Sequence, residues 1–264
     1  MKRLIIKALV CLCPVRKWRK QLRSRYLPVN MGNPNSKQAR FPAQFGEDLI
    51  LNFALSILKK RNLVDEINYL DIGANHPIAG NNTFFLYAQG YSGVIVEPNP
   101  VLFCAYSRIR PRDIGLNIGI HYTSDTIDSL PFYRFIEDPG LSSFDKTAAD
   151  LVLKNMPAIK SYEVIQTKIK SINSVIDEYF GGKAPTFISI DCEGIDFEII
   201  KSFDFKKYRP VLLCAETADP CVGGLGRKSQ DVLDFMRSMG YEVYADTYVN
   251  TIFIEKHVLS KMYV

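Results

Sequence analysis

Cysteine is scarce in this chain and occurs in no arrangement that would bind zinc. The six cysteines are scattered over 264 residues, mostly within apolar stretches. Cys11 and Cys13 stand too close together for a zinc site and have neither a second pair nor a histidine cluster at ligand spacing. This pattern favours reduced thiols in the cytoplasm over a disulfide framework, and we expect no structural zinc.

The sequence also lacks a hydrophobic run long enough to span a membrane. The apolar stretch from Leu4 to Val15 is interrupted by Lys7, whereas a membrane-spanning helix needs about 20 apolar residues. A secretory signal peptide is disfavoured too, because a basic run from Arg16 to Arg25 stands where its cleavage site should be. We therefore expect a cytoplasmic protein.

Acidic residues are missing from the first 46 positions, which hold 11 Lys and Arg. The remaining positions carry 22 basic and 28 acidic residues, so the formal charge of +5 combines a basic arm with an acidic globular part. Nucleic-acid binding requires a basic surface near the active site. The charge distribution therefore argues against a nucleic-acid partner.

Residues 1–27 have the pattern of a basic amphipathic helix. Their apolar side chains recur at intervals of three or four: Leu4, Ala8, Leu12, Val15, Trp18, Leu22 and Tyr26. Pro14 would kink such a helix. One interpretation is peripheral binding to anionic lipid at the inner membrane face. The alternative is an arm that is poorly ordered or that packs on the domain.

A single domain is predicted after this arm. Residues 28–43, which include Asn-Pro-Asn-Ser, are typical of a linker. Residues 44–264 are then long enough, at 47% apolar content for the whole chain, to bury one sizeable core. One doubly wound α/β unit would fit that length.

No complete G-x-G-x-x-G motif is present, but the chain contains a strand, helix, strand unit of about 30 residues. A predicted strand leads into Asp71 and Gly73, a helix follows over residues 81–90, and a second strand over residues 93–97 ends at Glu97. Ligands of parallel α/β sheets bind outside the carboxyl ends of the strands. Asp71 and Glu97 are therefore predicted to open onto one crevice.

These residue types favour S-adenosylmethionine over NAD as the ligand. Glu97 can accept both hydroxyls of an adenosine ribose, and Gly73 lets the backbone approach a ligand closely. Asp71 can order the loop and meet a cationic amino group, whereas it would repel a pyrophosphate. The alternative interpretation is structural, with Asp71 capping the following helix.

The rest of the chain repeats the pattern of apolar strands that end in acids. Predicted strands lead into Asp191 and Glu216, and the first of them continues into Glu193 and Asp196. The other predicted elements are a helix over 47–60, a strand over 113–120, an antiparallel pair over 131–135 and 164–170, helices over 172–180 and 229–239, and two strands over 241–248 and 251–255.

An ordered set of segments resembles the FkbM-type methyltransferases. The segments are Gln44-Phe-Gly-Glu-Asp-Leu-Ile, Leu70-Asp-Ile-Gly-Ala-Asn-His-Pro, Asn81-Asn-Thr-Phe-Phe, Val96-Glu-Pro-Asn-Pro and Ile190-Asp-Cys-Glu-Gly-Ile-Asp. Their order, spacing and position at strand ends all match the family, and the resemblance covers residues 44–255.

The resemblance implies an α/β, Rossmann-like class I methyltransferase fold: a mostly parallel sheet with an antiparallel terminal hairpin and helices on both faces. It also implies S-adenosylmethionine as the methyl donor and, commonly, transfer to a hydroxyl oxygen. Carried over by position, Asp71, Gly73, Ala74 and Asn75 would form the donor loop, and Glu97 would bind the ribose.

A hydroxyl acceptor is a poor nucleophile while protonated, so a general base should assist the transfer. Asp191 and Glu193 are the preferred candidates, because clustered acids raise one another's pKa. Glu216 and His76 are weaker candidates. The same acids could bind a divalent ion, but we favour no metal. For Asp196 we favour a structural role at the first turn of a helix.

The sequence therefore predicts an S-adenosylmethionine-dependent O-methyltransferase that acts on a carbohydrate, a glycan intermediate or a related small metabolite. Residues 141–144 and 220–226 are predicted loops that could line the acceptor pocket. One alternative is a non-catalytic binding module on the same fold. A less favoured alternative is an RNA methyltransferase that uses the basic arm.

Overall fold

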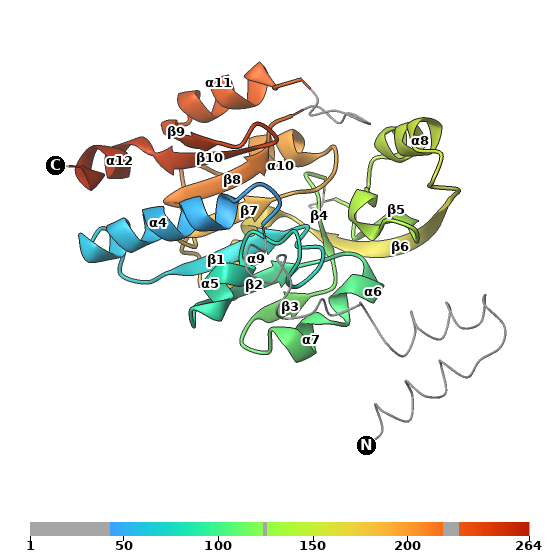
Figure 1. The fold of residues 1–264 in the computed structure, drawn as a ribbon, viewed down its shortest axis with the longest axis horizontal. Helices are drawn as coiled ribbons and strands as arrows, with labels where there is room; N and C mark the ends of the chain where they lie inside the picture. The colour runs from blue at the N-terminus through green and yellow to red at the C-terminus, as the bar shows by residue number, and fades with distance from the viewer. Residues whose placement is uncertain (1–42, 124–125, 219–226, 264) are drawn as a thin grey trace.

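A seven-stranded sheet forms the centre of the molecule. The computed structural model describes residues 43–123, 126–218 and 227–263. The strands follow the order β3-β2-β1-β7-β8-β10-β9 (Figure 1). Strand β10 runs antiparallel to β8 and β9, and the other neighbouring strands are parallel. The bounds are β1 Asn68–Ile72, β2 Ser92–Val96, β3 Ile114–Leu116, β7 Phe187–Ile190, β8 Leu212–Glu216, β9 Tyr241–Asp246 and β10 Asn250–Glu255.

Helices cover both faces of this sheet because its strand residues are apolar on both sides. Leu70 and Ile72 of β1 pack in one core cluster with helices α9 Ile172–Phe180, α10 Asp196–Ser202 and α11 Gln230–Ser238. Tyr69 faces the opposite cluster, with helices α4 Glu47–Lys60, α5 Phe84–Ala88, α7 Tyr106–Ile109 and α12 Lys256–Met262. A short helix, α6 Pro100–Phe103, precedes α7. This is the Rossmann-like class I methyltransferase architecture predicted from the sequence.

A second, three-stranded sheet is inserted between β3 and β7. It contains β4 Gly119–Ile120, β5 Ser129–Phe135 and β6 Tyr162–Lys170 in the order β4-β6-β5, with the 3-10 turn η1 Pro139–Leu141 and helix α8 Lys146–Asn155. The predicted antiparallel pair is confirmed as β5 and β6. Figure 1 places this sheet beside the carboxyl ends of the central strands.

The prediction of one strand over residues 113–120 was wrong. The chain leaves the central sheet after Leu116 and joins the second sheet at Gly119, so β3 and β4 are separate strands. The side chain of Asn117 donates to the backbone oxygens of Glu97 (2.8 Å) and Pro98 (3.1 Å). These bonds hold the segment between β3 and β4 against the end of β2. They produce no periodic pattern in the sequence, so the sequence did not predict them.

Glu47 joins the first turn of α4 to the hairpin between β9 and β10. Its Oε1 accepts from Thr247 Oγ1 (2.7 Å) and Asn250 Nδ2 (3.0 Å), and its Oε2 accepts from the backbone N–H of Phe45 (2.9 Å). Glu47 is fully buried. Glu47 therefore has a structural role in this fold, since it connects the first turn of α4 to the far edge of the sheet.

The described residues contain no helix that could cross a bilayer, since each is too short or too polar. The arm over residues 1–27 and all of the linker except Ala43 lie outside the described residues. Cys104, Cys192 and Cys214 are free thiols, whereas Cys11, Cys13 and Cys221 also lie outside the described residues.

A buried arginine cross-links the helices around β1. Arg110 at the end of α7 donates from Nε to Asp113 (2.7 Å) and from its two terminal nitrogens to Asn81 (2.9 Å), Thr83 (2.8 Å) and Tyr69 (3.1 Å). Its side chain has no exposed surface. A buried charge is tolerated only when it is paired and hydrogen-bonded, and this guanidinium has an ion pair with Asp113 and acceptors at all three nitrogens.

We predict that Arg110→Met destabilises the protein by about 3 to 5 kcal/mol, because it leaves Asp113 as a buried charge without its partner. Urea denaturation followed by circular dichroism would measure the loss. Arg108→Met is the matched control, since Arg108 is exposed on the same helix and should change the free energy of unfolding by less than about 0.5 kcal/mol. Equal effects of the two substitutions would contradict the assignment.

Candidate active site

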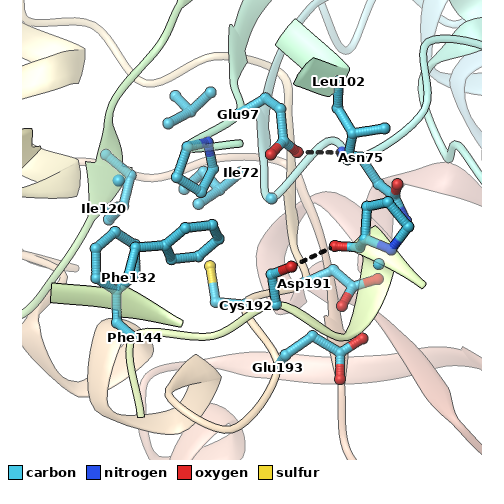
Figure 2. A pocket seen from close by; sticks show the side chains of 17 residues that line it. Ile72, Asn75, Glu97, Leu102, Ile120, Phe132, Phe144, Asp191, Cys192 and Glu193 are labelled. Atoms are coloured by element: carbon cyan, nitrogen blue, oxygen red, sulfur yellow. Dashed lines mark hydrogen bonds between the residues drawn. The ribbon is translucent and has the colours of Figure 1, made fainter. Parts of the chain in front are cut away.

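A cavity of about 440 Å³ opens at the carboxyl ends of β1, β2 and β7. Its polar wall is formed by Gly73, Asn75, Glu97, Asp191 and Glu193. The facing wall is apolar, and Figure 2 shows Ile120, Phe132 and Phe144 gathered opposite the acids.

Gly73 is required where β1 meets the end of β7. Its φ of +72° belongs to the left-handed region, and a Cβ at this position would lie 1.7 Å from the backbone oxygen of Asp191. Its N–H, like that of Ala74, donates to the backbone oxygen of Val96 at 3.0 and 3.1 Å, respectively. The loop is therefore packed between the ends of β2 and β7.

Glu97 is buried at the end of β2 and accepts from two backbone N–H groups. Its Oε2 accepts from Asn75 (2.6 Å) and its Oε1 from Asn99 (2.7 Å). Burial raises the pKa of Glu97 to about 7, although both N–H groups favour the ionised form. Each carboxylate oxygen can accept a further hydrogen bond, so the group can receive a pair of hydroxyls from the cavity.

Two predicted donor residues, Asp71 and Ala74, do not line the cavity. Asp71 is buried, and its Oδ2 accepts from Thr83 Oγ1 (2.6 Å) and Asn81 Nδ2 (3.3 Å). The backbone oxygen of Ala74 accepts from the hydroxyl of Tyr106 (2.7 Å). Both residues support the loop from behind, next to the Arg110 network, and their direct contact with a donor stays a prediction.

The predicted base candidates, Asp191 and Glu193, lie side by side at the end of β7. Burial, followed by the charge of Asp196, raises the pKa of Asp191 to about 7. Burial and the charges of Asp191 and Glu216 raise the pKa of Glu193 well above its ordinary value. Glu193 has a φ of +51°, which is uncommon for a residue with a Cβ, and its backbone oxygen accepts from Ser143 Oγ (2.7 Å).

The two remaining polar candidates of this region stabilise turns. Asp196 accepts from the backbone N–H groups of Cys192 (2.8 Å) and Gly194 (3.3 Å), which agrees with the structural role favoured for it. Nδ1 of His76 accepts from the N–H groups of Ile78 and Ala79, both at 3.0 Å, and burial lowers the pKa of this imidazole. His76 does not line the cavity.

A second cavity of about 420 Å³ lies at the carboxyl end of β8. Its lining includes Glu216, Thr217, Ser229 and the ring of Phe197. Burial, followed by the charges of Asp191 and Asp196, raises the pKa of Glu216 to about 8. The turn over residues 192–196 contributes to both cavities, with Cys192 and Glu193 in the first and Gly194 and Asp196 in the second.

Of the two loops predicted to line an acceptor pocket, residues 141–144 are described and residues 220–226 are not. Ser142 and Phe144 line the first cavity, and residues 220–226 lie outside the described residues. Ile120 and Phe132 of the second sheet were not anticipated as site residues. In the sequence they look like any other apolar strand residues. Their position at the cavity depends on how the second sheet packs, which the sequence pattern does not show.

The described part of the chain contains no group of three or more His, Cys, Asp or Glu side chains arranged to bind a metal ion.

Comparisons with known proteins bear on this site. A solved structure similar to this chain is a TehB-like SAM-dependent methyltransferase from Corynebacterium glutamicum ATCC 13032 Kitasato, with 9% sequence identity, a TM-score of 0.39, and coverage of 80% of this chain and 88% of that chain. A search of curated proteins found no match. The family model described as the methyltransferase FkbM domain matches residues 71–243, from the acid at the end of β1 into β9. This match spans more than half of the chain, which therefore belongs to the FkbM methyltransferase family.

Proposed function

We propose that the protein transfers a methyl group from S-adenosylmethionine to a hydroxyl oxygen of a carbohydrate, a glycan intermediate or a related metabolite. The observation that carries this proposal is the pair of cavities separated by the turn over residues 192–196. One cavity has the chemistry of a nucleoside site and the other has the polar lining of a hydroxylated acceptor site. Asp191 and Glu193, two of the acids with raised pKa, lie at or next to this turn.

The first cavity fits the donor. Glu97 would accept the two ribose hydroxyls, and the walls formed by Leu102, Ile120 and Phe132 are suited to a planar adenine ring. Asn75 and Asp191 lie where the amino-acid end of the donor would extend. When bound, S-adenosylmethionine supplies an electrophilic methyl carbon on a sulfonium. The negative charge of this wall would favour that cation over a neutral analogue.

The second cavity fits an acceptor with several hydroxyl groups. Thr217 and Ser229 can each donate and accept hydrogen bonds, and Glu216 adds a carboxyl group. The ring of Phe197 provides an apolar surface on which the C–H face of a sugar can pack. This combination favours a carbohydrate over a purely apolar metabolite.

Glu193 is the proton acceptor that we favour of the two candidates. It lines the donor cavity, and its neighbour Gly194 lines the acceptor cavity. The ionised Glu193 carboxylate would accept the proton of the acceptor hydroxyl as the oxygen becomes bonded to carbon. Asp191 would act by its charge, since it raises the pKa of Glu193. The rest of the rate enhancement would come from holding the acceptor oxygen in line with the methyl carbon and sulfur of the donor.

We predict that Glu97→Ala weakens binding of S-adenosylhomocysteine by about tenfold or more, because two hydrogen bonds to a charged group are lost. Isothermal titration with the purified protein would measure this change. Asp65→Ala, in the exposed loop after α4, should leave the affinity unchanged. If the folded wild-type protein binds no S-adenosylhomocysteine, the donor assignment is wrong and the non-catalytic binding module becomes the better interpretation.

We predict that Glu193→Gln lowers methyl transfer by about 100-fold or more, the usual effect of removing a general base. The assay would follow transfer of labelled methyl groups to the best acceptor found in a panel of sugars and glycans. Binding of S-adenosylhomocysteine should remain within about threefold, and the exposed variant Glu163→Gln should stay active. A fully active Glu193→Gln protein would exclude this role for Glu193.

We predict that the free energy of unfolding of the ligand-free protein falls as pH rises from about 5 to about 8. Folding raises the pKa of Glu97 and Asp191 to about 7 and that of Glu216 to about 8. The folded state therefore binds more protons than the unfolded state in this window, and stability is lost as these protons are released.

Glu216→Gln should flatten this profile, with a gain of about 1 to 3 kcal/mol at pH 8.5 and almost none at pH 5. Denaturation with urea at a series of pH values would measure both quantities. Glu137→Gln, at an exposed position, should reproduce the wild-type profile. A stability that rises between pH 5 and pH 8 would contradict the charge assignment of the site.

A further inference from the structure

Helix α4 exposes a ridge of large apolar side chains on its outer side. Leu49 and Phe53 are four residues apart on the helix, and their exposed fractions are 43% and 60%. Phe45, two residues before the first residue of α4, is 43% exposed. The opposite side of α4 packs on the sheet through Leu51, Leu55 and other buried residues. An amphipathic surface helix usually has a polar outer side. Helix α4 instead exposes large apolar side chains that do not pack on the sheet.

The outer side of α4 also lacks negative charge. The two acids of the helix, Glu47 and Asp48, are buried, whereas Ser56, Lys59 and Lys60 are exposed. The first exposed acids after the helix are Asp65 and Glu66, in the loop that follows it. This side can therefore approach an anionic surface, although acids outnumber bases after residue 46.

The basic N-terminal segment joins the domain at this ridge. The described chain begins at Ala43, two residues before Phe45. The 42 preceding residues contain 11 Lys and Arg and no Asp or Glu. Their sequence also carries apolar residues at helical spacing, including Trp18. The segment with the highest density of positive charge is thus covalently continuous with the exposed apolar ridge.

We propose that the ridge of Phe45, Leu49 and Phe53 binds an anionic lipid bilayer, and that the positive charge of the sequence before it strengthens the binding. The apolar side chains would enter the interface between headgroups and acyl chains, as those of interfacial helices do. Lys60 lies on the same side of the helix, about 20° from Leu49 at 100° per residue, where a lysine can place its stem along apolar surface and its ammonium among headgroups. The basic segment adds electrostatic attraction, and binding needs both contributions to be stable.

The test uses the full-length chain and vesicles of phosphatidylcholine with or without phosphatidylserine. Wild-type protein should sediment with the anionic vesicles at low salt and not with the neutral ones. The double variant Leu49→Gln, Phe53→Gln should bind the anionic vesicles at least about tenfold more weakly, because two buried apolar contacts are lost. The matched control is Ile136→Gln, Val164→Gln, which removes two similarly exposed apolar side chains, one just after β5 and one in β6.

Three results would overturn the proposal. They are an unchanged affinity of the α4 double variant, an equal loss in the matched control, and a wild-type dimer in analytical ultracentrifugation that the α4 variant converts to monomer. The last result would identify a second copy of the chain as the occupant of the ridge. Circular dichroism and titration with S-adenosylhomocysteine verify that both variants are folded. They also separate failure of this proposal from failure of the donor site.

Discussion

The close packing of β1 against the end of β7 is the constraint on which the site depends. At Gly73 the backbone of the donor loop lies so near the carbonyl of Asp191 that no Cβ fits between them. This contact sets the separation of the loop that carries Asn75 from the turn that carries Glu193. The Arg110 network and Tyr106 support the same loop from the other side. A rigid backbone between two buried polar networks is a suitable base for a site that must align two substrates.

The electrostatics of the site follow from the same topology. Parallel strands place their carboxyl ends at one edge, so the acids after β2, β7 and β8 gather in partly dehydrated surroundings. Burial and mutual repulsion raise their pKa values. Ionisation of these buried acids near neutral pH lowers the free energy of unfolding, and a bound cation would offset part of that loss. The acids that would attract a sulfonium thus also include Glu193, whose pKa burial and neighbouring charges raise well above its ordinary value.

Helix α4 connects the edge of the sheet to the part of the chain before residue 43. Glu47 joins α4 to the hairpin of β9 and β10, and the ridge lies on the outer side of that helix. One helix therefore contributes a buried face to the core, a buried acid to the edge of the sheet and an exposed apolar face to the surface. The family match begins only at Asp71, so α4 precedes the segment that the family model covers.

The sequence by itself determined the order of elements, the parallel core and the strand-end acids, because apolar runs, glycine breaks and carboxylates follow local rules of spacing. Gly73, Glu97, Asp191 and Glu193 were identified in this way and Asn75 through the family resemblance, and all five line one cavity. Only the tertiary structure showed that Asp71 turns into the Arg110 network, that residues 113–120 divide between two sheets, and that Ile120 and Phe132 close the cavity. These features depend on contacts between residues far apart in the chain, which leave no periodic signal in the sequence.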